Sequence, residues 1–126
     1  MKEFENSAYF WQKVDTLYTS GDFKILKEKG SLHDTYPSLI YPCDYCLVTD
    51  LDEEVSLEAF KAKDAKKVDA IVVCADIINK NFEVKALIGL NDEETEEVLR
   101  FLNCTDYQKT IYIKRGKLVP SWAETE

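Results

Sequence analysis

The stretch VDAIVVCADIINKNFEVKALIGL, residues 68–90, decides the fold of this chain. Its first part, Val68–Ile78, is a nearly continuous apolar run, which is typical of a strand buried on both faces. Asn79–Asn81 is a turn signal, and Phe82–Leu90 alternates apolar with polar residues as a strand does. Two such runs separated by three residues predict an antiparallel hairpin.

Two helical patterns lie on either side of this hairpin. Residues 7–20 carry apolar side chains at helical spacing, with Asn6 or Ser7 as caps at the start and Gly21 at the end. After the hairpin, Asn91 is followed three residues later by Glu94, the spacing of a capping box. The chain therefore has a helix near its N-terminus and another in its C-terminal half.

Shorter patterns complete the order of elements. Phe23–Lys27, Lys29–Tyr45 continuing into Val48, and Lys109–Lys114 read as strands, whereas periodicity does not settle Ser56–Lys61 as helix or strand. With no repeat and no linker, residues 1–126 are predicted to form a single α+β domain with a mainly antiparallel sheet. Pattern alone does not distinguish a barrel from an open sheet.

Composition restricts the class of protein. The chain has 126 residues and a net charge of −8, and such a surface repels nucleic-acid phosphates and anionic membranes. No apolar run approaches the roughly 18 residues of a membrane span, and the N-terminal residues lack the apolar core of a signal peptide. We therefore expect a cytoplasmic protein that binds neither nucleic acid nor membrane.

Four cysteines admit more than one interpretation. Cys43 and Cys46 form a C-x-x-C pair, but no second tight pair accompanies them as in a structural zinc site. The pair also lies in a proline-bounded strand pattern, whereas a thioredoxin-type motif opens a helix. Buried free thiols are the favoured interpretation, with a metal site and a redox role as alternatives.

The segment KGSLHDTYPSLIYPCDY, residues 29–45, carries a family resemblance. Tyr41–Tyr45 fits the pattern Y-P-x-[ND]-Y, and it follows Phe10–Asp15 (FWQKVD) and Lys29–His33 (KGSLH) in that order. In these motifs the chain resembles the soluble inorganic pyrophosphatases, and it is more similar to the short clostridial-type pyrophosphatase-like proteins. A plain strand between turns is the alternative interpretation of residues 29–45.

The resemblance implies a fold and an activity. The fold is a small antiparallel β-barrel flanked by the two helices, and the activity is hydrolysis of pyrophosphate or another small phosphoanhydride with Mg²⁺. Such chemistry needs clustered carboxylates for metal ions, an activated water, and cationic or hydroxyl groups that hold phosphate. The implied substrate-binding residues are Lys29, Tyr45 and Lys85, with His33 as a further candidate, the metal ligands are Glu53, Glu58, Asp76 and Glu83, and the catalytic acids are Glu53 and Glu58.

One departure from the family pattern bears on activity. Residues 53–58 read EEVSLE where the family has the run DGDPxD, so glutamates replace aspartates and the flexible glycine is absent. Because catalytic groups tolerate displacement poorly, hydrolysis is expected to be weak or lost. The alternatives are a non-catalytic domain that binds a phosphate compound or protein partner, a structural or oligomerising domain that uses Trp11 and Trp122, and a merely solvated acidic loop at residues 50–58.

Overall fold

The computed structural model describes residues 6–19, 22–36, 38–49, 56–63, 65 and 67–116. Within them, two helices and six strands follow one another along the chain. They are α1 (Ala8–Thr19), β1 (Asp22–Lys27), β2 (Asp44–Thr49), β3 (Ser56–Lys61), β4 (Val68–Asp76), β5 (Asn81–Ile88), α2 (Asp92–Leu102) and β6 (Gln108–Lys114).

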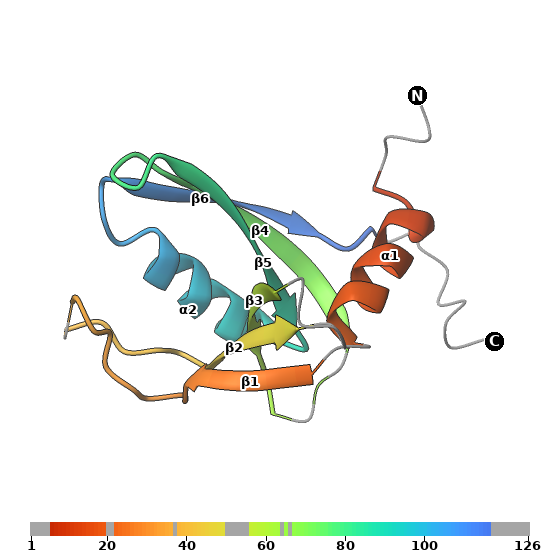
Figure 1. Cartoon of the computed structure of the whole chain (residues 1–126), viewed down its shortest axis with the longest axis horizontal. Helices are drawn as coiled ribbons and strands as arrows, with labels where there is room; N and C mark the ends of the chain where they lie inside the picture. Colours follow the sequence, from red (N-terminus) through yellow and green to blue (C-terminus); the bar gives the residue numbers. More distant parts are fainter. Residues whose placement is uncertain are drawn as a thin grey trace.

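The strands form one mixed sheet in the order β1-β2-β3-β5-β4-β6 (Figure 1). The pair β3–β5 is parallel and the other pairs are antiparallel, including the predicted β4–β5 hairpin. This confirms an α+β fold with a mainly antiparallel sheet. The β-barrel is not confirmed, because the sheet of the described strands is open, with β1 and β6 at its edges.

Each helix covers a different face of the sheet. Trp11, Val14 and Tyr18 of α1 pack against a cluster that includes Ile71 and Ala86. Val98 and Leu102 of α2 pack against Phe60, Val72 and Leu87 on the other face. Neighbouring residues of β4 and β5 thus belong to separate cores, which explains why β4 is apolar almost throughout. The protein therefore has two hydrophobic cores, one on each face of the sheet, and not the single enclosed interior of a barrel.

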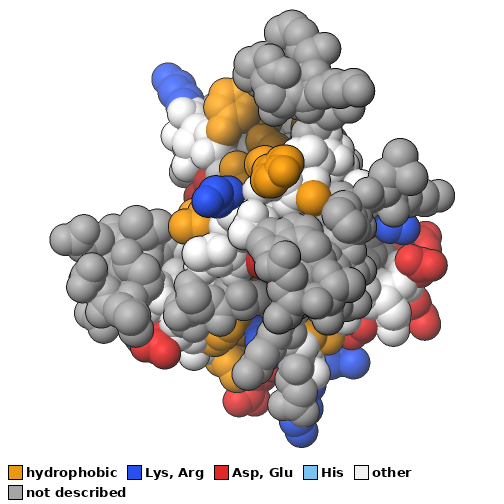
Figure 2. Space-filling view, turned by 90° about the vertical axis from the view of Figure 1, so that its right-hand side faces the viewer, with side chains coloured by type: hydrophobic (Ala, Val, Ile, Leu, Met, Phe, Trp, Pro, Cys, Tyr) orange, Lys and Arg blue, Asp and Glu red, His pale blue; other side chains and the backbone are white. Residues whose placement is uncertain are grey.

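The helix α1 covers its face of the sheet only in part. Phe10 and Leu17 belong to the apolar pattern of residues 7–20, but they are 44% and 53% exposed. The buried stripe of the helix is therefore narrower than this pattern predicts. Figure 2 looks onto the side of the molecule that carries α1 and shows hydrophobic side chains reaching the surface in several places. On β5, Phe82 and Val84 continue the face of Ala86 but are 79% and 44% exposed. They lie beyond the reach of the helix.

The segment before β2 is a folded loop rather than the predicted strand, which begins only at Asp44. Backbone hydrogen bonds from Gly30 N to Tyr41 O and from His33 N to Leu39 O, both 2.9 Å, fold the loop onto itself. Gly30 has φ +89°, a left-handed conformation that glycine adopts without strain. The unsettled residues Ser56–Lys61 form β3, in the middle of the sheet. Neither described helix is long and apolar enough to span a bilayer.

An ion pair joins α1 to the end of β6. The guanidinium of Arg115 donates to both carboxylate oxygens of Asp15 at 3.0 and 2.9 Å, and also to Val68 O at 2.8 Å. Both charged side chains are largely buried, at 16% and 21% exposure. Two parallel charged hydrogen bonds of this kind are geometrically specific and stronger than neutral ones. They fix the position of α1 against the sheet.

We predict that Arg115→Met lowers the free energy of unfolding by about 1–3 kcal/mol, because a largely buried carboxylate loses two charged donors. Urea unfolding followed by circular dichroism measures the loss. The matched control is Arg100→Met, which removes an exposed ion pair with Glu96 inside α2. That change should cost less than about 0.5 kcal/mol. Equal losses in the two variants would contradict the proposed role of the Arg115 pair.

Candidate functional site

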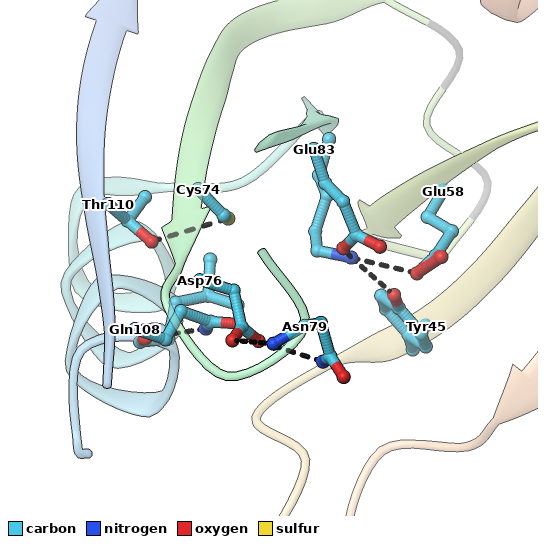
Figure 3. A network of polar contacts seen from close by, with 10 residues as sticks. Tyr45, Glu58, Cys74, Asp76, Asn79, Glu83, Gln108 and Thr110 are labelled. Carbon is cyan, nitrogen blue, oxygen red and sulfur yellow. Dashed lines mark hydrogen bonds and ion pairs between the residues drawn. The ribbon is translucent and has the colours of Figure 1, made fainter. Parts of the chain in front are cut away.

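The centre of the candidate site is Lys85 on β5, a lysine with only 5% of its surface exposed. Its Nζ donates to Tyr45 Oη at 2.7 Å and to Glu58 Oε2 at 2.8 Å, and it lies 3.1 Å from Glu83 Oε2. Strand pairing brings these groups together, because Glu58 is the parallel partner of Lys85 on β3 and Glu83 precedes it by two residues on the same face. Figure 3 shows Tyr45, Glu58 and Glu83 converging at this point.

Electrostatics keep the lysine charged. Burial by itself would lower the pKa of Lys85, but the hydrogen bond that Lys85 donates to Glu58 and the charges of Glu58 and Glu83 outweigh it, so its pKa is raised above the usual value. The ammonium also lies 5.2 Å from the centroid of the Tyr45 ring, within cation–π range. Two carboxylates against one ammonium give this cluster a net negative charge. An anion approaching Lys85 therefore has to displace or neutralise its carboxylate partners.

Lys85 and Tyr45 line a pocket of about 270 Å³, and seven of its sixteen lining residues carry aromatic rings. His33 stacks on Tyr41 at 5.9 Å between centroids, and Tyr41 in turn contacts Phe101 at 4.8 Å. The Nδ1 atom of His33 accepts hydrogen bonds from the backbone N of Thr35 and Tyr36, so the ring is held in place. The loop before β2 thus forms one wall of the pocket. The remaining aromatic lining residues are Tyr36, Tyr45, Phe60 and Tyr107.

A second polar group lies in the same pocket, at the β4–β5 turn. Asp76 Oδ1 accepts from the backbone N of Ile78 and Asn79, both at 2.9 Å, and its Oδ2 accepts from Asn79 Nδ2 at 3.0 Å. Gln108, at the start of β6, donates from Nε2 to Leu102 O at 2.8 Å. Figure 3 shows Asp76, Asn79 and Gln108 grouped on one side, with Tyr45 and Glu58 on the other.

The structure separates the residues that the resemblance implied into three sets. Tyr45, Glu58, Glu83 and Lys85 lie together, and Asp76 lines the same pocket, although its carboxylate is engaged in capping a turn. Lys29 is not among the residues of this pocket: it is exposed, its backbone N donates to Asp44, and its neighbours in another hollow include Lys61 and Lys63. Glu53 lies outside the described residues.

Sequence patterns missed several residues of the pocket. Phe101 lies on α2 next to the buried Leu102, Tyr107 lies in the connection to β6, and Gln108 begins β6. The available signal was a single aromatic residue, Phe101, close in sequence to the apolar residues Val98 and Leu102 of the helix. Within the described ranges, no three His, Cys, Asp or Glu side chains form a group that could hold a metal ion.

Comparison with known proteins adds no relative: no protein-family model and no curated protein matches the chain.

The cysteines are free thiols, and one of them differs from expectation. Cys43, Cys46 and Cys74 are buried, whereas Cys104 is exposed and lines the pocket. Burial raises the pKa of the Cys43 thiol to about 12. Cys104 is exposed because α2 ends at Leu102, and the following residues run over the surface. Of the four thiols, Cys104 is thus the accessible one.

We predict that iodoacetamide modifies Cys104 of the native protein at neutral pH far faster than it modifies Cys43, Cys46 or Cys74. The three buried thiols need local or global opening before they react, and burial disfavours their thiolate forms. Peptide mass spectrometry over a time course measures each rate. Fast labelling of Cys43 in the folded protein would contradict the buried position of the loop before β2.

We further predict that the double variant E58Q/E83Q is destabilised by about 3 kcal/mol, because the buried ammonium of Lys85 loses both counter-charges. Lys85→Met should cost less, since both carboxylates are partly exposed and stay hydrated. Urea unfolding measures both losses. A larger loss of stability in Lys85→Met than in E58Q/E83Q would contradict this. It would show that the carboxylates need the lysine more than the lysine needs the carboxylates.

The stability of E58Q/E83Q should also depend on pH in a different way from that of the wild type. In the wild type the raised pKa keeps Lys85 charged, and its stabilising effect is lost only as the pH rises through that pKa. In E58Q/E83Q burial acts unopposed and lowers the pKa of Lys85. As the pH rises, Lys85 loses its proton, and the free-energy cost of burying an unpaired ammonium disappears. The stability gap between wild type and double variant should therefore narrow from about pH 7 to pH 10.

Proposed function

We propose that this chain binds a small phosphate compound together with Mg²⁺ in the Lys85 pocket, as a pyrophosphatase-like protein whose phosphoanhydride hydrolysis is weak or lost. The observation that carries the proposal is the position of Lys85, a charged, buried lysine that lines a pocket together with Tyr45. Its Nζ meets Tyr45 Oη and the carboxylates of Glu58 and Glu83, which are not themselves among the lining residues. A lysine and a tyrosine hydroxyl supply donors for phosphate oxygens.

The carboxylates explain why a cation would accompany the phosphate. Glu58 and Glu83 form ion pairs with Lys85, and their negative charges oppose an incoming anion. Mg²⁺ is commonly bound by one or two protein carboxylates together with substrate phosphates and water. Glu58 and Glu83 fit this pattern, whereas Asp76 is engaged by the turn. If Glu58 and Glu83 held a cation, Lys85 Nζ would be available to phosphate.

The residues are better suited to binding than to rapid hydrolysis. Bound Mg²⁺ would neutralise phosphate charge, but hydrolysis also needs a water held in line with the scissile bond by further acids. Among the described residues, the two carboxylates at Lys85 are the acids directly at the phosphate-binding lysine. Glutamates in place of aspartates at residues 53 and 58 carry the charge on longer arms. Weak turnover follows from this difference in position.

Isothermal titration with pyrophosphate, with Mg²⁺ and with EDTA, tests the proposal. We expect binding that weakens at least about tenfold without Mg²⁺, and a similar loss in Lys85→Met, because a charge-assisted hydrogen bond contributes about 1.5–3 kcal/mol. Lys24→Met, which removes an exposed lysine on β1, is the matched control and should bind as the wild type does. Equal binding by Lys85→Met would overturn the proposed site.

Phosphate release by the same proteins measures the catalytic part. We expect slow or undetectable turnover of pyrophosphate with Mg²⁺. Rapid turnover that is abolished by Lys85→Met would instead identify an efficient enzyme with glutamate ligands, and would overturn the statement that hydrolysis is weak. The alternative of a protein partner predicts no pyrophosphate binding under either condition.

A further inference from the structure

The walls of the Lys85 pocket are more aromatic than a bare phosphate compound requires. Seven of its lining residues carry rings, and they contact one another in pairs such as Tyr45–Phe60 at 4.8 Å and Tyr36–Tyr107 at 6.3 Å between centroids. Phosphate oxygens gain nothing from ring faces. Beside these packed rings, the lining residues leave a volume of about 270 Å³ that a ligand can enter.

The end of the pocket at the β4–β5 turn offers acceptors. Gln108 uses Nε2 to donate to Leu102 O, and Asn79 uses Nδ2 to donate to Asp76. Each amide is thereby oriented, and its carbonyl oxygen receives no hydrogen bond from any described residue. Such oxygens accept N–H groups and disfavour anions. The pocket therefore has a lysine at one end, acceptors at the other, and rings along its walls.

We propose that the phosphate compound is a nucleotide whose base carries an amino group. Its phosphates meet Lys85 and Tyr45, its base stacks on the ring of Phe101, and its amino group donates to Gln108. This inference rests on the proposed phosphate binding and adds the class of ligand to it. Lysine, rings and acceptors all line one pocket, so a single ligand can reach all three.

The test is isothermal titration in Mg²⁺ with four probes: ADP, IDP, ribose 5-phosphate and pyrophosphate. ADP and IDP differ in the amino group, and ribose 5-phosphate lacks a base. Stacking of a base on aromatic side chains is worth about 1–3 kcal/mol, so ADP should bind roughly 5- to 150-fold more tightly than pyrophosphate. Loss of the amino hydrogen bond should make IDP about threefold to tenfold weaker than ADP.

Two variants locate the base. Phe101→Leu keeps an apolar side chain on α2 but removes the ring, and should weaken ADP roughly tenfold while leaving pyrophosphate binding unchanged. Gln108→Met keeps the length of the side chain without its acceptor, and should reduce the difference between ADP and IDP. Tyr9→Leu, which removes an exposed ring on α1, is the control and should change neither affinity. Circular dichroism establishes that each variant is folded.

The outcomes separate this inference from the proposed function. Equal affinity for all four probes, or binding of pyrophosphate without ADP, would overturn the nucleotide and leave phosphate binding intact. ADP binding that is insensitive to both Phe101→Leu and Gln108→Met would place the base elsewhere and overturn the inference as well. Failure of every probe to bind would overturn both proposals.

Discussion

The constraint on which this structure depends is that the central strands must bury both faces. β4 and β5 lie inside the sheet, and their side chains alternate between a core under α1 and a core under α2. Each buried apolar side chain contributes roughly 1.5–3 kcal/mol, so neither face can be left to water along the whole strand. The two helices lie on opposite faces for this reason.

The same alternation places a lysine in the α2 core. Lys85 has Ala86 beside it in the α1 core and Leu87 two residues later in its own. An ammonium at such a position is tolerated only with partners, and Tyr45, Glu58 and Glu83 provide them. A buried ion cluster of this kind contributes little net stability compared with an apolar side chain. Its cost suggests that Lys85 serves a ligand, which is why the proposals centre on it.

The local elements agree with the sequence patterns, and some of the implied site residues come together in the fold. The β4–β5 hairpin and the helix capped by Asn91 and Glu94 lie where the patterns predict, since each depends on residues close in the chain. The loop at residues 29–43 was mistaken for strand, because its hydrogen bonds run within the loop and not along a ladder. Lys29 was assigned by motif, and it lines another hollow and not the Lys85 pocket.

The sequence by itself determined the class of fold, the hairpin, the two helices and the position of Glu83 and Lys85 on one face of a strand, because these follow from periodicity. Only the tertiary structure decided that the sheet is open and that β3 runs parallel to β5 with Glu58 opposite Lys85. It also decided that Phe101 and Gln108 meet residues 33–45 around one pocket. Such contacts join segments far apart in the chain, and their register depends on how two cores pack, which no local pattern records.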